Sequence, residues 1–280
     1  MDVKMRCSEA ASSATSTCSR DGFRITTRKL PILKSGPIED MTNKLGIAPP
    51  EMIFGDNHVT IAHLKSGWQI SFNAFDALDR VDKTGGSMLQ VAYSKEWQKN
   101  RERHTEGIKE VVKPFDWSFS TDYKGTIRKT DAQHLDLDFK PTNHDLPMHL
   151  LRLPDPILFF DDVMLYEDEL ADNGLSMVSV KIRVMPERLL LLSRFFMRLD
   201  DVVFRIRDTR VFVEFKTGEV LREYQAWEGK FEDVKSRLMM QHGGREAEVL
   251  QIMRDANGLL QAGGLKIVDE TRERLELPVG

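Results

Sequence analysis

The strongest constraint on the fold is an alternation of apolar and polar residues in the second half of the chain. Apolar residues occupy every second position in the stretches 178–184, 202–207 and 211–215. A β-strand turns successive side chains to opposite faces, so a period of two predicts strands with one buried and one wet face. Antiparallel sheets are the ones that commonly leave one face to solvent. The chain is therefore expected to fold around an antiparallel sheet.

Turn residues divide this region into separate strands. Asp172-Asn173-Gly174 lies between two apolar runs, and Asn-Gly is a strong signal for a tight β-hairpin. Leu189–Leu199 fits a helix or a strand; we favour a strand because Asp200-Asp201 can turn directly into the next one. Asp208-Thr209-Arg210 interrupts the apolar alternation, which predicts a break between two strands.

Shorter elements are expected in the first half. Phe23–Leu30 alternates like a half-buried strand, and Gly36–Gly46 has the Pro and Gly signals of a short helix. Two β-rich runs, 58–64 and 68–73, predict a hairpin, after which Asn73 is suited to cap a helix.

The middle of the chain is less regular. Met88–Ala92 is a strand candidate, and a charged helix is expected from Lys95 onward. The aromatic-rich stretch 115–127 predicts a further strand. Proline-rich residues 140–156 predict a loop.

The two ends differ from the rest in character. Residues 1–20 are expected to form a disordered leader, because Ala10–Ser19 is nearly all Ala, Ser and Thr. Residues 229–280 have helical spacing and predict a helical, divergent C-terminal appendage with a frayed end. The core domain is then 21–228. The predicted fold class is α+β, with largely antiparallel sheets and flanking helices.

Composition excludes several classes of protein. Lys and Arg number 40 against 44 Asp and Glu, a net charge of −4, which does not favour a nucleic-acid protein. No apolar run approaches the roughly 18 to 20 residues of a membrane span. Cys7 and Cys18 are the only cysteines, so a reducing compartment is expected. No nucleotide-binding glycine motif and no nucleophile elbow is present.

A metal site is one hypothesis. His134, Asp136 and Asp138 alternate, His144 follows, and alternating ligands on one strand can converge on a metal ion. Residues at this spacing more often form a solvated strand face, and no His-x-x-x-His pair accompanies them. A metal-dependent hydrolase therefore stays an alternative, and no bound metal or other cofactor is the favoured prediction.

Cations recur on the polar positions of the predicted strands. If these strands neighbour each other, Lys181, Arg183, Arg205 and Arg207 line one wet face. Guanidinium forks bind carboxylate or phosphate through two hydrogen bonds, so such a face could hold an acidic peptide or a chain terminus. The competing interpretation is a set of ordinary surface charges paired with neighbouring acids.

Seven long blocks carry a family resemblance. They are Pro50–Asn57, Ile70–Leu78, Lys113–Thr126, Leu165–Leu170, Ser179–Pro186, Arg205–Arg210 and Leu221–Tyr224. In order and spacing they resemble the TIPRL family (TOR signalling pathway regulator-like), whose members regulate type 2A protein phosphatases. The resemblance covers about residues 21–228 and does not extend into the C-terminal region.

The resemblance implies a non-enzymatic regulator that binds catalytic subunits of type 2A-group phosphatases, including their C-terminal tail. It implies control of phosphatase assembly or activity in TOR-linked signalling. The partner-binding residues expected from the matching blocks and the polar strand positions are Asp76, Lys181, Arg183, Arg205, Arg207, Asp208, Arg210 and Tyr224. The cations would take the tail carboxylate, Tyr224 would pack against the tail, and the two aspartates would accept its hydrogen bonds or hold the cations.

Two further expectations accompany this interpretation. The protein is expected in the cytoplasm, with the nucleus left open, and as a monomer when unbound, with no nucleic-acid or membrane partner. A general signalling scaffold is the other alternative role.

Overall fold

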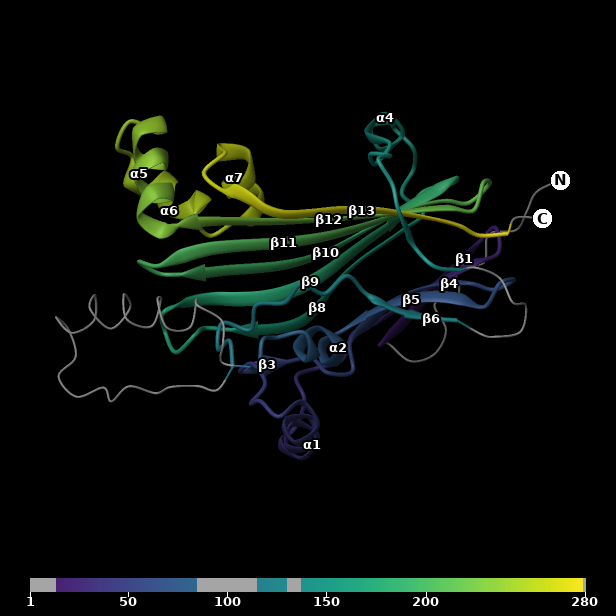
Figure 1. Cartoon of the computed structure of the whole chain (residues 1–280), viewed down its shortest axis with the longest axis horizontal. Coiled ribbons are helices and arrows are strands. Elements are labelled where there is room, and N and C mark those ends of the chain that lie inside the picture. Colours follow the sequence, from purple (N-terminus) through teal and green to yellow (C-terminus); the bar gives the residue numbers. More distant parts are fainter. Residues whose placement is uncertain (1–13, 85–114, 130–136, 279–280) are drawn as a thin grey trace.

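Two antiparallel sheets pack together to form the body of the molecule (Figure 1). The structure is a computed structural model that describes residues 14–84, 115–129 and 137–278. The smaller sheet has the strand order β1 (Thr15–Arg20), β2 (Phe23–Arg28), β4 (His58–His63), β5 (Trp68–Asn73) and β6 (Thr126–Arg128).

The larger sheet has eight strands. Their order is β3 (Met52–Ile53), β8 (Phe159–Asp168), β9 (Gly174–Val184), β10 (Arg188–Leu199), β11 (Val203–Glu214), β12 (Glu219–Lys230), β13 (Lys266–Glu276) and β7 (Lys140–Pro141). The five long strands from β8 to β12 follow each other as a meander, so each hairpin turn fixes the register of the next pair.

We call the two sides of the larger sheet the inner and the outer face. The inner face carries Val180, Leu191 and Val211, which share one core with residues of the smaller sheet such as Ile25 and Ile61. The outer face has separate cores at its two ends. The smaller sheet therefore covers the inner face, and other parts of the chain cover the two ends of the outer face.

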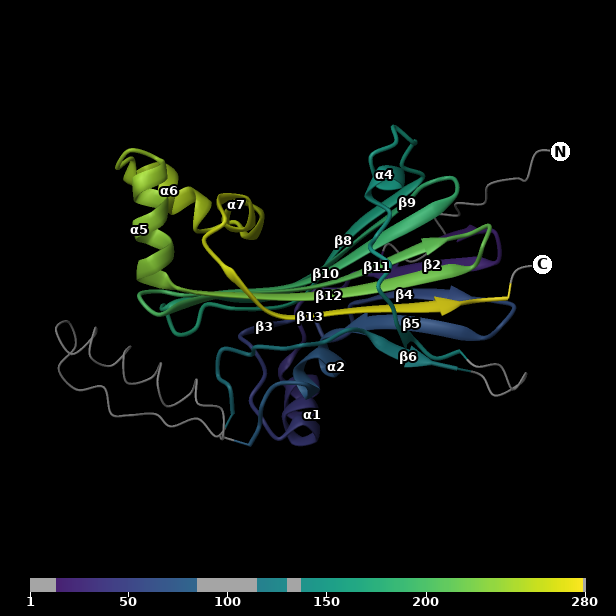
Figure 2. The ribbon, with the colours of Figure 1, turned by 45° about the horizontal axis from the view of Figure 1, so that its top comes forward.

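Short helices cover what the sheets leave open. At one end of the outer face, α5 (Phe231–Gln241), α6 (Glu246–Ile252) and α7 (Ala256–Ala262) pack on Phe204 and Ile206. At the other end, α4 (Met148–Leu151) packs beside Phe212. Figure 2 shows α4 and the C-terminal helices on the same side of the larger sheet.

Two more helices lie on the opposite side. These are α1 (Ser35–Leu45) and α2 (Ala74–Asp79), which lie below the larger sheet in Figure 1. Gly46 ends α1 in the left-handed conformation, with φ of 73°. The Asn73 side chain accepts a hydrogen bond from the backbone N–H of Asp76 and so caps α2.

The predicted fold class is confirmed. The expected hairpins at 58–73 and around Asn173 are present, and Leu189–Leu199 is a strand rather than a helix. Two other expectations, the strand Met88–Ala92 and the helix from Lys95, lie outside the described residues.

The expectation of a disordered leader is wrong for residues 15–20, which form β1 and pair with β2. Asp21 and Gly22 both have positive φ, as the turn of a tight hairpin requires, and Asp-Gly is a recognised signal for that turn. Cys18 is buried, so even this polar strand contributes to the core. Residues 1–13 lie outside the described part of the chain.

The expectation of a purely helical appendage over 229–280 is also incomplete. The helices are present, but the last strand, β13, returns to the larger sheet and pairs along β12. Leu275 and Leu277 are buried in the main core, so the end of the chain is part of the same sheet rather than frayed.

Two predicted strand boundaries are corrected. In 115–127 only the final residues join a strand, because Phe119 with φ of 56° and neighbouring turns keep the rest irregular. Strand β11 runs without a break through Asp208-Thr209-Arg210. The alternation changes phase there because Phe204 and Ile206 point outward, whereas Val211 and Val213 point inward.

Gly174 is the position where the hairpin between β8 and β9 tolerates no side chain. Its φ is 151°, and a Cβ atom would lie 1.9 Å from the backbone oxygen of Arg198. We expect Gly174→Ala to lower the free energy of unfolding by about 2–3 kcal/mol, measured by urea denaturation. Gly36→Ala, at a helical site with nothing within 4 Å, should be neutral or slightly stabilising. Equal effects at both sites would contradict the steric argument.

Candidate functional site

The predicted cations do not share one face of the larger sheet. Lys181 of β9 lies opposite Leu192 of β10, which lies opposite Arg210 of β11, so these residues share the outer face. Arg183 is two positions from Lys181 and also faces outward. Arg205 and Arg207 have the other parity on β11 and face inward. The expectation of a single cationic face is therefore wrong, because an intervening strand sets the register.

On the outer face, Asp208 is fully buried between two arginines. Its carboxylate accepts hydrogen bonds of 2.6 Å from Nε and Nη2 of Arg194, and one of 2.8 Å from Nη2 of Arg210. Arg194 also donates to Asn257 in α7. This cluster attaches α7 to the sheet, so the contacts of Asp208 in this structure are structural. Its expected contact with a partner stays a prediction.

On the inner face, Arg205 is also buried, with 3 % of its surface exposed. It donates to Asp116 at 3.2 Å and to Ser120, and its Nε lies 3.3 Å from Glu228. Arg207 pairs with the same Glu228. Both charges are thus neutralised inside the protein, and Arg205 has little surface to offer a partner.

The segment 115–125 lies across the inner face and is attached at several points. Ser176 donates to the carbonyl oxygen of Ser118 on one side, and Thr209 donates to that of Tyr123 on the other. Thr121 donates to the carbonyl oxygen of Ala77 in α2. The segment is irregular, yet it is fixed by hydrogen bonds to side chains of the larger sheet and to the backbone of α2.

A cavity of about 580 Å³ lies beside this segment. Its walls are the end of α2 with residues 76, 79 and 80, the segment 122–127, and Arg222 of β12. Of the predicted site residues, Asp76 lines this cavity, and Tyr224 lies next to it under Lys124. The structure therefore brings Asp76 and Tyr224 to the inner face, away from Lys181 and Arg183.

Asp76 is held in place by its neighbours. Asn73 donates from Nδ2 to its carboxylate at 2.7 Å, and the hydroxyl of Thr126 donates to the same oxygen. Tyr123 donates to the carbonyl oxygen of Ser71 at 2.9 Å. These contacts orient the acidic wall of the cavity before any ligand binds.

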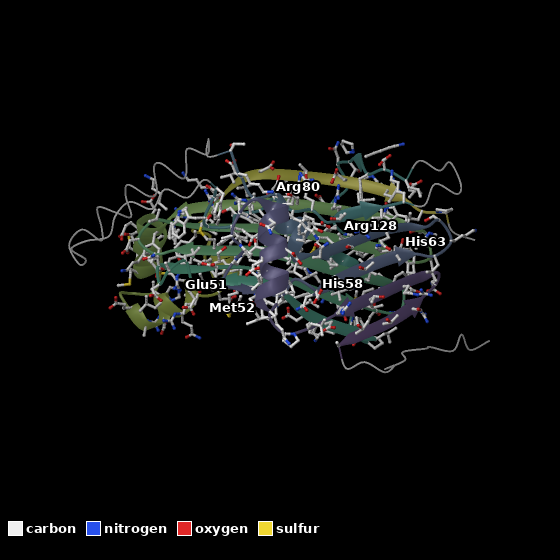
Figure 3. The ribbon with its side chains drawn as sticks, turned by 90° about the horizontal axis from the view of Figure 1, so that it is seen from below. Glu51, Met52, His58, His63, Arg80 and Arg128 are labelled. Atoms are coloured by element: carbon white, nitrogen blue, oxygen red, sulfur yellow. The ribbon has the colours of Figure 1, made fainter. Side chains whose placement is uncertain are left out.

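Three cations border the cavity. Lys124 lies 4.3 Å from the ring centroid of Tyr224 and donates to Thr271 at 3.1 Å. Arg222 pairs with Glu273 at 2.7 Å and donates to the carbonyl oxygen of Lys124 at 3.2 Å. Arg80 is exposed at the end of α2, and its side chain has no hydrogen-bond or ion-pair partner within the described residues; Figure 3 shows it from below.

Sequence reasoning missed these three cations. Lys124 stands in a cluster interpreted only as a turn, Arg80 lies near the end of the helix predicted after Asn73, and Arg222 lies in a block matched only for its family pattern. The available signal was the position of Lys124 and Arg222 inside the matching blocks. Their convergence depends on the packing of β12 against the segment 115–125, which no local pattern encodes.

The proposed metal ligands are only partly described. His134 and Asp136 lie outside the described residues. Asp138 pairs with Lys129, and Nδ1 of His144 lies 4.0 Å from Glu219. Within the described part of the chain, no group of three or more His, Cys, Asp or Glu side chains could hold a metal ion. In the same residues no helix is both long and apolar enough to cross a membrane.

The chain was compared with known proteins. The model of the TIP41-like family matches residues 52–235, which include α2, the segment 115–125 and most of the larger sheet. The chain belongs to the TIP41-like family. This confirms the family resemblance carried by the sequence blocks.

Named relatives agree over most of the chain. The type 2A phosphatase activator TIP41 of Saccharomyces cerevisiae is 43 % identical over 257 residues, covering 85 % of this chain and 69 % of the relative. The TIP41-like protein of Homo sapiens is 45 % identical over 211 residues, 74 % of this chain and 75 % of its own. The type 2A phosphatase activator tip41 of Schizosaccharomyces pombe is 33 % identical over 228 residues, 81 % and 87 % of the two chains.

A substitution at Asp116 tests whether its ion pair with Arg205 holds the wall of the cavity in place. Asp116→Ala leaves the buried Arg205 without one of its carboxylates, so we expect the free energy of unfolding to fall by about 3 kcal/mol. The exposed pair of Asp138 and Lys129 is the control, and Asp138→Ala should change stability by less than about 1 kcal/mol. Urea denaturation of both variants checks this, and equal losses would contradict the prediction.

Titration of the Tyr224 hydroxyl makes the free energy of unfolding depend on pH in the alkaline range. Burial, the largest cause, raises the pKa of its hydroxyl from 10.0 to about 12. The folded state therefore binds a proton that the unfolded state releases first, and stability falls as the pH rises from about 10 to 12. Burial also raises the pKa values of Tyr123 and Tyr166.

We expect Tyr224→Phe to flatten part of this decline, because the titrating hydroxyl is gone. Urea denaturation at pH 8, 10 and 11 measures the slope, with approximate values chosen from the pKa shift. An unchanged slope in the variant would assign the pH dependence to other groups.

Proposed function

We propose that this chain is a non-enzymatic regulator that binds the catalytic subunit of type 2A-group protein phosphatases and holds its C-terminal tail in the cavity beside α2. The observation that carries the proposal is the family membership, together with relatives named type 2A phosphatase activators at 43 % and 33 % identity. The proposal assigns no catalytic residue. It places the protein in the cytoplasm, with access to the nucleus, in TOR-linked signalling, and as a monomer when unbound.

The cavity supports this proposal through its size and its charges. About 580 Å³ accommodates a few peptide residues, which is the scale of a chain terminus. Arg80 is exposed and unpaired within the described residues, and Lys124 lies nearby, so a carboxylate can find cations here at little desolvation cost.

The acidic wall serves the peptide backbone. Asp76 and Asp122 line the same cavity and can accept hydrogen bonds from peptide N–H groups. Tyr224 is 2 % exposed, so it supports Lys124 from below rather than meeting the tail directly. A mixed lining of this kind favours a free chain end, which carries both N–H donors and a terminal carboxylate.

The charge reversals Arg80→Glu and Lys124→Glu test the cavity. We expect each to weaken binding of a synthetic phosphatase tail peptide at least tenfold, since each replaces an attractive contact with a repulsive one. Amidation of the peptide's carboxyl terminus should weaken binding of the unchanged protein to a similar degree. Fluorescence anisotropy measures all three.

Arg254→Glu is the matched control. Arg254 is exposed, but it lies by α7 at the outer face, so its reversal changes net charge without touching the cavity. Unchanged affinity in the two cavity variants would contradict the assigned site. Failure of the purified chain to bind an intact catalytic subunit, with phosphatase activity followed in parallel, would contradict the proposed function itself.

A further inference from the structure

A row of side chains on the outer face ends in an uncovered aromatic ring. Phe160 of β8, Arg183 of β9, Leu190 of β10 and Phe212 of β11 lie opposite one another on four neighbouring strands. The core beneath α4 covers Phe212 and partly covers Leu190. At the other end of the row Phe160 is 58 % exposed. The row therefore passes from a covered core to an open apolar surface.

Arg183 differs from the neighbouring cations Lys181, Arg188 and Arg194. Lys181 pairs with Asp162 at 3.1 Å, Arg188 with Asp155 at 2.9 Å, and Arg194 with Asp208 at 2.6 Å. Arg183 has no ion pair with any described residue, and its Nε is buried without a hydrogen-bond acceptor. The residue as a whole is partly exposed, so a carboxylate of a partner can supply the ion pair that Arg183 lacks among the described residues.

Further apolar side chains are exposed along the chain that leads into β8. Ile157 is 57 % exposed, and Met148 and Leu153 of the α4 region are exposed as well. The α4 region is held on the sheet because Arg188 donates to the carbonyl oxygen of Leu150 at 3.0 Å and pairs with Asp155. With Phe160, exposed large apolar side chains therefore occur four times between positions 148 and 160.

We propose that this surface, formed by Phe160, Arg183 and Leu190, binds a peptide segment of a partner protein in which an acidic residue stands next to an aromatic or aliphatic one. The carboxylate would meet the terminal nitrogens of the Arg183 guanidinium, which has no ion pair with a described residue. The apolar residue would cover Phe160.

This surface is separate from the cavity of the proposed function. It lies on the outer face, whereas the cavity beside α2 lies on the inner side of the same sheet. A partner held here would leave the cavity free, so the protein could hold two partners at once. The failure of one proposal therefore leaves the other unaffected.

A designed peptide is the probe. Fluorescein-labelled Gly-Glu-Phe-Asp-Leu-Glu-Phe-Gly supplies alternating acidic and apolar side chains, and anisotropy with the full chain measures its binding. One control peptide carries Gln and Asn in place of the acids, and another carries Ser in place of the apolar residues. We expect the first peptide to bind at least fivefold more tightly than either control.

Variants locate the binding. Arg183→Gln and Phe160→Ser should each weaken binding of the peptide at least fivefold. Arg183→Lys should weaken binding too, because an ammonium group lacks the paired donors of a guanidinium group. Arg254→Gln, an exposed arginine on the same face beside α7, should leave the affinity unchanged. Thermal unfolding of each variant confirms that the fold is retained, and Phe160 and Arg183 are tested separately so that one unfolded variant does not decide the result.

Several outcomes would overturn the proposal. These are no binding at millimolar peptide, an affinity that Arg183→Gln does not alter, and displacement of the probe by the phosphatase tail peptide, which would place it in the cavity. A concentration-dependent dimer that Arg183→Gln abolishes would show instead that a second copy of the chain occupies the surface.

Discussion

The buried guanidinium of Arg205 is the interaction on which the inner side of the molecule depends. An arginine that is 3 % exposed is stable only when its charge is matched, and Asp116, Ser120 and Glu228 match it. Asp116 and Ser120 belong to an irregular segment that would otherwise have no sheet to pair with. The ion pair thus fixes the backbone of 115–125, and that backbone forms one wall of the cavity beside α2.

On the outer face a buried charge of the opposite sign is also neutralised by its neighbours. There a buried carboxylate, Asp208, is matched by Arg194 and Arg210, and Arg194 continues to Asn257 in α7. Two buried ionic clusters on opposite faces of one strand, β11, therefore attach the coverings of both sides. The single sheet between them keeps the charged cavity and the apolar surface apart. Arg183 differs from its neighbouring cations because it has no ion pair with a described carboxylate.

Much of the fold could be predicted from local patterns. The alternation in β9 to β11, the Asn173-Gly174 turn and the capped helix after Asn73 all describe interactions between residues close in sequence, and the structure contains them. The errors lie where distant contacts dominate. The polar strand β1 forms because it pairs with β2 and buries one cysteine. Strand β13 pairs with β12 although three helices separate the two strands in the sequence. Residues 115–125 look like a strand because they are aromatic, but their rings fill gaps between layers.

The sequence by itself determined the class of fold and the family, because long blocks of uncommon residues and a period of two persist without knowledge of packing. Only the tertiary structure decided which faces those residues occupy. When one side of a sheet is exposed to solvent, the polar residues of a strand are expected on that side. Strand β11, however, is covered on both sides. Its polar residues are therefore interior ion pairs, and the cations expected together are separated by the thickness of the sheet.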